Sequence, residues 1–274
     1  MKKIILIFSL LVSLLTFSQE KYIASFNTLR LGKGEKNYGA MAEAIKNFHM
    51  VGLVEVMNRR GVEELADALQ KSTGKKWDFH ISPYAEGDSG YKEYYGYIWQ
   101  REEAVLIKEM GFYPDPENRF TRPPYGAFFR MGNFDFILVM AHSVFGKSPS
   151  LRRAEAFNYD EVYDYFQSLD EKEKDVIIAG DFNLSGNDEA FEQMTVLHPD
   201  KIIYGIDPTM KTTIGNKGLA NAYDNIFLST IHTREFQGKS GKYDFTGGDY
   251  QRSKKEVSDH LPVFIVVDTE EDDD

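Results

Sequence analysis

Polar side chains with acid–base or ligand chemistry stand at the ends of apolar runs in this sequence. Glu55 closes one such run, His142 follows a second, and Asp181 and Asn183 follow a third. A carboxylate at the end of a buried strand is costly unless it is exposed, paired or bound to a cation. Each position taken alone also fits an exposed strand end, a structural histidine or an ordinary turn. Asp181 and Asn183, two positions apart, also suit a hard cation or a phosphate.

Other polar residues open apolar runs instead of closing them. Asp224 begins one run, and Asp259 and His260 directly precede the last one. The set has no paired serine nucleophile, and the chain has no cysteine, so a covalent acyl or thiolate route is unsupported. Hard oxygen ligands beside two imidazoles that carboxylates can orient favour metal-assisted hydrolysis of a phosphate ester.

The composition sets the limits within which this site must be built. The chain has 274 residues, of which 42% are hydrophobic and 27% charged, enough for a sizeable core in one domain. The formal net charge of −11 argues against a protein held to a polyanion by overall attraction alone. With no cysteine, disulfides and thiolate zinc sites are excluded.

The two ends of the chain differ in composition from the rest. Residues 1–19 have two lysines, an uncharged apolar run and a polar end, which predicts a cleaved signal peptide and a secreted or periplasmic protein. The alternative is an uncleaved membrane anchor, although the run is short for a bilayer. We expect one domain over residues 20–268, an acidic tail over 269–274, and no membrane span after cleavage.

Hydrophobic periodicity predicts the elements that would position the polar residues. Helical spacing appears over residues 38–48, on the face formed by Val62, Leu65, Ala66 and Leu69, and over 154–166, where we expect one longer helix. Strands outnumber helices, which indicates packed sheets covered by helices. The apolar strands are expected over residues 22–27, 51–56, 95–100, 134–141, 176–180, 224–229 and 262–267.

The order of the motifs resembles the endonuclease/exonuclease/phosphatase superfamily, and within it the deoxyribonuclease I branch. The resemblance spans about residues 22–267 and implies an α/β (α+β) fold, a four-layer αββα sandwich with two packed β-sheets flanked by helices. The matching segments are Ser25-Phe26-Asn27, Leu53-Val54-Glu55-Val56, Tyr91-Lys92-Glu93, Arg122-Pro123, Ala141-His142-Ser143, Gly180-Asp181-Phe182-Asn183, Ala222-Tyr223-Asp224 and Ser258-Asp259-His260-Leu261-Pro262-Val263.

The resemblance also implies how the site would hold its metal and its substrate. Glu55 would be the main Mg²⁺ ligand, with Asn27 and Asp259 close by, and Mn²⁺ could replace Mg²⁺. Asp181 and Asn183 would position the scissile phosphate, the attacking water or a second ion. A structural Ca²⁺ ion stays undecided, because the segment 212–222 does not reproduce the calcium loop of the family.

The two histidines would form an acid–base pair across the phosphate. The resemblance implies that Glu93 orients His142 and that Asp224 orients His260. We take His260 as the base and His142 as the acid, and the sequence leaves the reverse assignment open. Arg122 and Tyr91 would contact the phosphate backbone of the substrate.

The implied activity is that of a secreted, Mg²⁺-dependent, monomeric endonuclease that leaves 5′-phosphate ends on DNA and has no stable protein partner. Met57 stands where the deoxyribonuclease pattern has an arginine for the minor groove, so duplex preference is weakened, although Arg59 or Arg60 could substitute. The alternatives are a phosphodiesterase or phosphatase for phospholipid or sugar-phosphate headgroups, and a binding protein without activity.

Basic residues follow or precede most of the predicted site residues, which predicts a cationic rim on an acidic body and a hydrolysis rate that falls steeply with salt. These residues are Arg30, Lys33, Lys36, Arg59, Arg60, Arg119, Arg122, Lys147, Arg152, Arg153, Arg252, Lys254 and Lys255.

Overall fold

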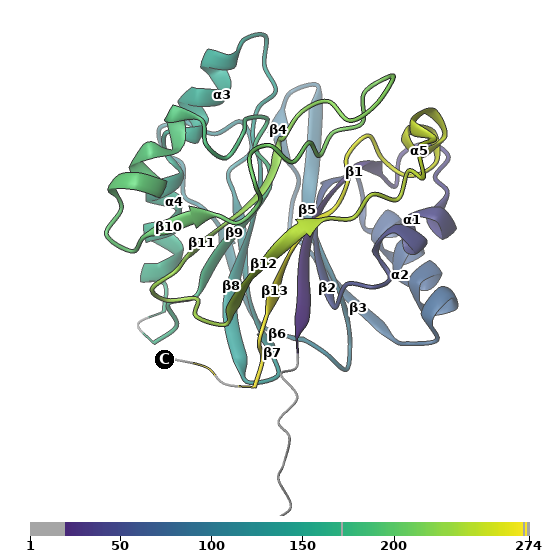
Figure 1. The fold of residues 1–274 in the computed structure, drawn as a ribbon, viewed down its shortest axis with the longest axis horizontal. Helices are drawn as coiled ribbons and strands as arrows, with labels where there is room; N and C mark the ends of the chain where they lie inside the picture. Colours follow the sequence, from purple (N-terminus) through teal and green to yellow (C-terminus); the bar gives the residue numbers. More distant parts are fainter. Residues whose placement is uncertain (1–19, 171, 271, 273–274) are drawn as a thin grey trace, which may run out of the picture.

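Two mixed β-sheets packed face to face form the centre of the protein (Figure 1). The structure is a computed structural model that describes residues 20–170, 172–270 and 272, so the predicted signal peptide lies outside the described residues. The first sheet has the strand order β12-β13-β1-β2-β5-β3, with β4 paired to β5. Its strands are β1 (Lys21–Leu31), β2 (Met50–Val56), β3 (Trp77–Ile81), β4 (Glu86–Asp88), β5 (Tyr91–Gln100), β12 (Phe236–Lys242) and β13 (Val263–Val267).

The second sheet has the strand order β10-β11-β9-β8-β7-β6. Its central strands β8 and β9 are buried along almost their whole length, as their uninterrupted apolar sequences predict. Its strands are β6 (Val105–Phe112), β7 (Tyr125–Met131), β8 (Phe134–His142), β9 (Val176–Asp181), β10 (Ile202–Tyr204) and β11 (Asp224–Ser229).

Helices cover the outer face of each sheet and complete four layers. On the first sheet, α1 (Tyr38–Ile45) and α2 (Arg59–Thr73) bury their apolar faces in one cluster with β1 and β2. On the second sheet, α4 (Tyr159–Ser168) and the short helical turns η1 (Glu189–Phe191) and η2 (Gln193–Leu197) pack over β8 and β9. The predicted αββα sandwich is therefore confirmed. Among the helices of the described residues, none has the length and apolar character to cross a bilayer.

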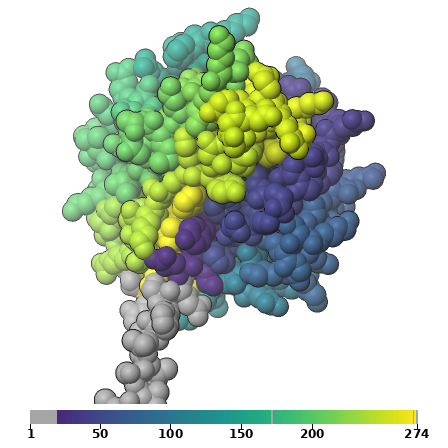
Figure 2. Space-filling view, turned by 45° about the vertical axis from the view of Figure 1, so that its right-hand side comes forward, coloured from purple at the N-terminus to yellow at the C-terminus, as the bar shows by residue number. Residues whose placement is uncertain are grey.

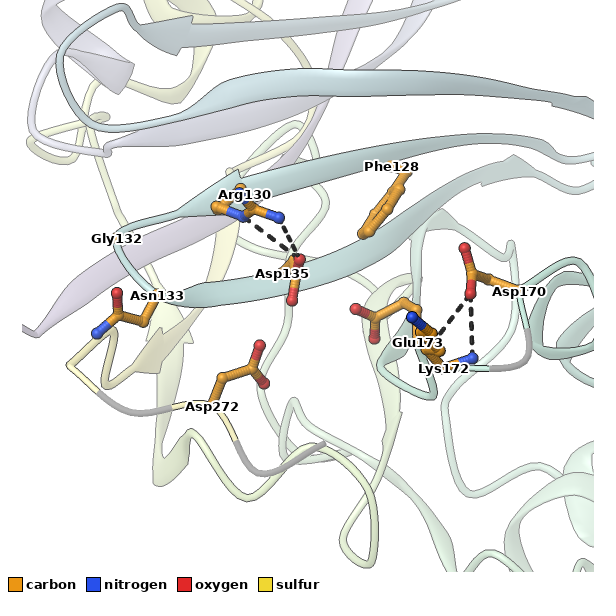
Figure 3. Close-up of a pocket in the computed structure, with 9 residues that line it drawn as sticks. All are labelled: Phe128, Arg130, Gly132, Asn133, Asp135, Asp170, Lys172, Glu173 and Asp272. Carbon is orange, nitrogen blue, oxygen red and sulfur yellow. Dashed lines mark hydrogen bonds and ion pairs between the residues drawn. The ribbon is translucent and has the colours of Figure 1, made fainter.

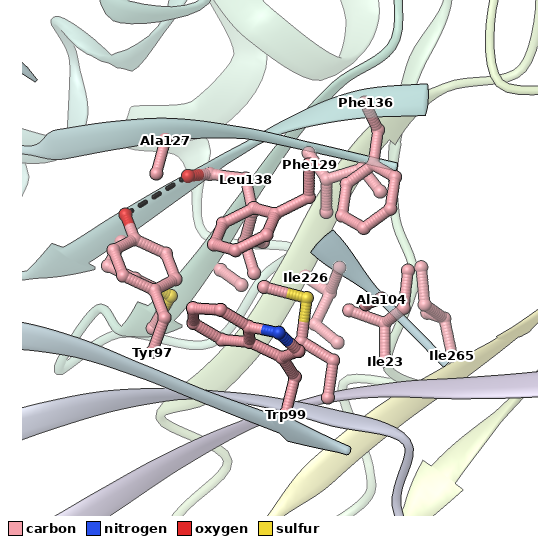
Figure 4. Packing of buried hydrophobic residues seen from close by; sticks show 14 of the residues in the cluster. Ile23, Tyr97, Trp99, Ala104, Ala127, Phe129, Phe136, Leu138, Ile226 and Ile265 are labelled. Atoms are coloured by element: carbon pink, nitrogen blue, oxygen red, sulfur yellow. Dashed lines mark hydrogen bonds between the residues drawn. The ribbon is translucent and has the colours of Figure 1, made fainter. Parts of the chain in front are cut away.

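A third apolar cluster fills the space between the two sheets (Figure 4). Trp99 of β5 meets the ring of Phe129 of β7 edge to face, with 5.2 Å between ring centroids. The Tyr97 hydroxyl, buried in the same layer, donates to the Tyr125 carbonyl oxygen at 2.6 Å and lies 3.1 Å from the Leu138 carbonyl oxygen. The sheets are therefore joined by side-chain packing and by a buried hydrogen bond. This packing holds the strand ends of one sheet beside the strand ends of the other.

Strand directions explain why distant polar residues reach that rim. β1 runs parallel to β2, and β8 runs parallel to β9, so Asn27, Glu55, His142 and Asp181 come at or near the ends of four central strands. β11 is antiparallel to β9, and its first residue, Asp224, lies directly opposite Asp181. In an antiparallel pair, the first residues of one strand lie beside the last residues of the other. Asp224 and Asp181 therefore lie at the same edge of the sheet.

Two helix predictions need correction. The single helix expected over residues 154–166 is two helices, α3 (Pro149–Ala156) and α4, with a break at Phe157 and Asn158. At the break the Asn158 side-chain amide donates to the Ala154 carbonyl, in place of a continued backbone ladder. The helix expected over residues 38–48 ends at Ile45, although Phe48 is buried beside it as the pattern suggests.

The first and last strands of the domain are neighbours, because β1 and β13 pair antiparallel. Figure 2 shows the two ends of the described chain side by side on the surface. A cavity of about 760 Å³ lies beside the β7–β8 hairpin and is lined largely by charged side chains, including Asp135 and Arg130 (Figure 3). Asp135 and His142 stand near opposite ends of β8, so this cavity is remote from the rim where the polar residues meet.

Candidate active site

A cavity of about 370 Å³ opens at the rim where the predicted site residues converge. Both sheets contribute to its wall. The residues of the predicted set that line it are Glu55, His142, Asp181, Asn183, Asp259 and His260. The structure thus brings together side chains that lie more than 200 residues apart in the chain.

Asp181 stands between the two histidines. Its Oδ2 atom is 3.6 Å from Nε2 of His142 and 3.5 Å from Nε2 of His260. Its Oδ1 accepts a hydrogen bond from the Asn183 backbone N–H, which holds the carboxylate in one orientation. The Nε2 atoms of the imidazoles therefore face a common point from two sides and lie no more than about 7 Å apart.

Each imidazole is held from behind by its own buried carboxylate. His142 Nδ1 lies 2.6 Å from Oε1 of Glu93, and His260 Nδ1 lies 2.8 Å from Oδ2 of Asp224. Glu93 and Asp224 are 0% and 2% exposed, so neither carboxylate is screened by water. The predicted pairing of His142 with Glu93 and of His260 with Asp224 is what the structure shows.

Thr212 positions Asp224, and its role was not apparent from the sequence. Its hydroxyl donates to the same Asp224 Oδ2 that meets His260, at 2.6 Å, and its Oγ1 accepts from the Asp224 N–H. Thr213, the next residue, pairs with His260 in an isolated β-bridge. A threonine in a loop carries no local signal of such a contact, because the contact depends on two distant segments meeting.

Glu55 occupies an unusual backbone position. Its φ of 59° lies in the left-handed region, which costs a non-glycine residue about 1 kcal/mol or more. The residue sits at a register shift between β2 and β5, where its N–H donates to the Glu93 carboxylate and the Thr28 hydroxyl donates to the neighbouring Val54 carbonyl. These bonds hold the strained turn, which lets a carboxylate at the end of a buried strand point into the cavity.

Asn27 connects Glu55 to Asp181. Its side-chain nitrogen is 3.1 Å from Oε1 of Glu55 and 3.1 Å from Oδ2 of Asp181. The Asn27 backbone carbonyl accepts from the Ser258 hydroxyl at 2.6 Å, and the same hydroxyl accepts from the His260 N–H. One buried amide and one buried hydroxyl therefore fix the end of β1 against the segment that carries Asp259 and His260.

The glycine before Asp181 is required by close packing of the backbone. Gly180 has φ 155°, and a Cβ atom at this position would stand 1.8 Å from the Ala141 carbonyl oxygen of the parallel strand β8. Only a residue without a side chain permits the pairing of Ala141 with Gly180 that sets His142 beside Asp181. Asn183 then adopts φ 53°, and its side-chain amide donates to the Ser143 carbonyl.

Tyr91 and Arg122, the expected phosphate contacts, lie in different surroundings. The Tyr91 hydroxyl donates to Oε2 of Glu55 at 3.0 Å, so it faces the site. Arg122 is only 8% exposed, and its guanidinium donates to the carbonyls of His142 and Ser143. In this position Arg122 supports the end of β8 behind His142, and contact with a phosphate would require it to leave these carbonyls.

The predicted cationic rim is smaller than the sequence suggested, because several of its arginines are paired with acidic residues. Arg59 and Arg60, the proposed substitutes for the minor-groove arginine, pair with glutamates four residues on along α2. Arg153 pairs with Asp188. By contrast, Arg30 lies over the Tyr91 ring, with 5.5 Å from Cζ to the ring centroid, and is therefore close to the site.

Burial and charge act in opposite directions on the two imidazoles. Burial disfavours the charged form of His260, but the carboxylates of Asp224 and Asp181 outweigh it and raise its pKa to about 10. Burial likewise opposes the charge on His142, while the Glu93 carboxylate raises its pKa. Burial raises the pKa of Asp181, against the lowering effect of both imidazoles. The site therefore favours protonated imidazoles when no other cation is present.

Two groups of residues could hold a metal ion. Ligand atoms of Asp181, Asp224 and His260 all lie within 4.8 Å of one another. The predicted group is Glu55, Asn27 and Asp259, and it offers the oxygen ligands that hard cations prefer. Within the described residues, Oδ1 of Asp259 is buried and has no hydrogen-bond partner, so this oxygen is available to a ligand at the cavity.

Lys36 is a cation close to that second group. Its ammonium donates to the carbonyls of Thr28 and Leu29. Burial lowers the pKa of Lys36, while the charges of Glu55 and Asp259 act in the opposite direction. Glu55, Asp259 and Asp181 thus place three carboxylates on the wall of the cavity where a phosphate would enter.

Both the sequence and the fold of the chain are similar to those of known proteins. A deoxyribonuclease of Thioalkalivibrio sp. (strain K90mix) is 29% identical over 257 residues, which cover 89% of this chain and 70% of that protein. Deoxyribonuclease-1-like 2 of Mus musculus is 23% identical over 267 residues, covering 90% and 91% of the two chains. The crystal structure of an endonuclease/exonuclease/phosphatase family protein from Bacteroides thetaiotaomicron superposes with a TM-score of 0.62 at 16% identity, covering 91% of this chain and 98% of that chain. No family model matches the chain.

The fold, the paired imidazoles and the relatives define the class of the protein. The chain is similar in sequence to deoxyribonucleases, and its fold is that of the endonuclease/exonuclease/phosphatase superfamily. Within that superfamily it is a deoxyribonuclease-like phosphodiesterase, with a candidate metal-binding group at Asp181, Asp224 and His260.

Proposed function

We propose that the protein is an exported, Mg²⁺-dependent endonuclease that hydrolyses DNA and leaves 5′-phosphate ends. The observation that carries the proposal is the pair of imidazoles that face Asp181 from two sides, each backed by a buried carboxylate. Hydrolysis of a phosphodiester by in-line attack needs a proton acceptor on one side of phosphorus and a proton donor on the other. Two oriented imidazoles across one cavity supply both.

Proton transfer follows from this arrangement. In its neutral form, which a cation bound nearby would favour, His260 Nε2 accepts a proton from the attacking water, and Asp224 stabilises the imidazolium that results. The water oxygen bonds to phosphorus as the bond from phosphorus to the 3′ oxygen breaks, and His142 Nε2 donates its proton to that leaving oxygen. The products are a 5′-phosphate and a 3′-hydroxyl. The reverse assignment of the two histidines gives the same products.

The carboxylates on the wall of the cavity disfavour a phosphodiester unless cations offset their charge. We propose that Glu55, Asn27 and Asp259 hold Mg²⁺, because they offer oxygen ligands and because Oδ1 of Asp259 is buried without a partner among the described residues. The ion supplies charge neutralisation to the phosphoryl oxygens. The group formed by Asp181, Asp224 and His260 includes an imidazole nitrogen, which suits Mg²⁺ less well.

DNA is proposed as the substrate because the two curated relatives are named deoxyribonucleases and align with about 90% of this chain. Export is proposed from the composition of residues 1–19. Sequencing the N-terminus of the protein released by expressing cells would test export. A chain that stays in the cell with residues 1–19 attached would contradict it.

The activity can be tested with supercoiled plasmid in Mg²⁺ or EDTA. We expect nicking in Mg²⁺ alone, and losses of at least about a hundredfold for His142→Ala and His260→Ala, since each removes a proton-transfer group. His232→Ala is a matched control, because His232 pairs with Asp200 outside the cavity. Release of phosphate from phospholipid or sugar-phosphate headgroups without nicking would favour the alternative substrate class. A folded protein inert on all substrates would indicate a binding protein.

The product ends can be tested separately. DNA ligase closes a nick only between a 5′-phosphate and a 3′-hydroxyl. We therefore expect ligase alone to reseal plasmid nicked by this protein. Nicks that stay open until the ends are treated with a kinase and a phosphatase would contradict the proposed direction of cleavage.

A further inference from the structure

An aromatic side chain stands exposed at the edge of the candidate active site. Phe145 lies three residues after His142 and lines the same cavity as Glu55 and Asp181. Its side chain is 59% exposed, which is high for a phenylalanine. Exposed single apolar residues are common on protein surfaces, so its position and its support must decide whether it has a role.

The backbone on both sides of the ring is held in place. The Phe145 carbonyl accepts from Nε of Arg152 at 2.6 Å, and the preceding Val144 N–H donates to the buried Glu155 carboxylate at 2.7 Å. Arg152 and Glu155 both belong to α3, which therefore anchors the loop. A ring on such a loop keeps its position beside the cavity at low cost in conformational entropy.

Arg152 supports the Phe145 ring from one side. Its Cζ atom is 4.1 Å from the centroid of Phe145 and 5.6 Å from that of Tyr223. Its Nη1 donates to the Asn183 carbonyl and to the Tyr223 hydroxyl. These partners are all uncharged, so none of them neutralises the guanidinium. The result is a stack of phenylalanine, arginine and tyrosine, joined to the loop that carries Asp181 and Asn183.

We infer, on the basis of the proposed DNA hydrolysis, that Phe145 stacks against an unpaired base next to the scissile phosphate and that Arg152 attracts the adjoining backbone. An exposed aromatic ring at the edge of the cavity can stack on the face of a base, and base faces are covered in a continuous duplex. The stack therefore selects single-stranded or locally opened DNA. Because every base has such a face, it confers little sequence preference.

The substitution Phe145→Ala tests this inference against Phe145→Tyr, which keeps a ring, and Phe157→Ala, which removes an equally exposed ring (56%) beyond the other end of α3. The substrates are a short single-stranded oligonucleotide and the same sequence in a duplex. We expect the wild type to cleave the single strand at the higher kcat/KM. Phe145→Ala should raise KM for the single strand about tenfold with little change in kcat, and should leave the duplex rate unchanged. Phe145→Tyr and Phe157→Ala should behave as the wild type.

A binding measurement keeps the inference testable if the protein cleaves no DNA. A single strand containing 2-aminopurine loses fluorescence when its base stacks, and this can be followed in Mg²⁺ with the full chain, in a His260→Ala background if the protein cleaves. We expect quenching by the wild type and by Phe145→Tyr, but not by Phe145→Ala. Equal effects of Phe145→Ala on both strand forms, or quenching that survives the loss of the ring, would overturn the inference. Absence of cleavage with quenching retained would instead count against the proposed activity alone.

Discussion

Replacing Asp224 with asparagine tests the central electrostatic relationship of the site. The substitution keeps the size of the side chain and an oxygen near His260 Nδ1, and it removes one charge. His260 is 9% exposed, so water screens this charge weakly. Asp224 is the strongest of the groups that raise the pKa of His260 to about 10.

The magnitude follows from the separation of the two groups. Charges centred about 4 Å apart interact by about 4 kcal/mol at an effective dielectric constant of about 20. That energy corresponds to about three pH units, so the pKa of His260 in Asp224→Asn should fall from about 10 to about 7. The imidazole also loses the carboxylate that orients it, and we expect kcat to fall about a thousandfold.

The pKa can be measured by NMR titration of the histidine ring protons in metal-free protein, with the His260 signal assigned through His260→Gln. Asp200→Asn serves as the control, since it removes a carboxylate 3.4 Å from a different imidazole, that of His232. A His260 pKa that moves by less than about one pH unit in Asp224→Asn would refute the reasoning. So would an equal loss of activity in the control.

Three further predictions concern the metal, the backbone and the acid limit of stability. Glu55→Gln should weaken Mg²⁺ binding at least about tenfold, as measured by calorimetry on metal-free protein, whereas Glu43→Gln, at an exposed position, should leave it unchanged. Equal Mg²⁺ affinities of the two variants would show that Glu55 is not a ligand. Gly180→Ala should lower the free energy of unfolding in urea by about 3 kcal/mol, because its Cβ would meet a backbone carbonyl, and Gly39→Ala should cost little; matching losses would contradict the packing argument. Burial lowers the pKa of His49 to about 4, so the unfolded chain takes up a proton first as pH falls from 6.5, and stability present above that pH is lost towards pH 4. Between pH 7 and pH 4.5 the free energy of unfolding, measured in urea, should therefore fall by about 1.5 kcal/mol less in His49→Asn than in the wild type, a value reduced because the ring is partly exposed. Equal decreases in the two proteins would show that His49 is not responsible.

The residue types and their places at strand ends were sufficient to predict much of the site. His142 and Asp181 follow uninterrupted apolar runs, and such runs predict buried strands whose ends lie at a rim. The four-layer fold was implied by the resemblance of the motifs and their order to a known superfamily. The ends of the helices could not be predicted from hydrophobic periodicity. The break at Asn158, for example, involves a side-chain hydrogen bond to the Ala154 carbonyl, and such a bond leaves no trace in the spacing of apolar residues.

The support of the site could not be predicted in the same way. Thr212 holds Asp224, and Arg122 holds the end of β8, through bonds whose partners are 12 and 20 residues away. The charge of the rim also depended on pairing, since Arg153 meets Asp188 while Arg152 lies between two aromatic rings. Neighbouring arginines with the same local sequence character thus have different electrostatic roles.

The chain by itself determined which chemistry was possible: two imidazoles, hard oxygen ligands and no thiol, carried on apolar strands. Only the tertiary structure decided that His142 and His260 face the same oxygen of Asp181, and that an exposed Phe145 lies beside them. The physical reason is that local sequence sets the direction and burial of each strand. Distances between strand ends depend instead on how two sheets pack against a shared core.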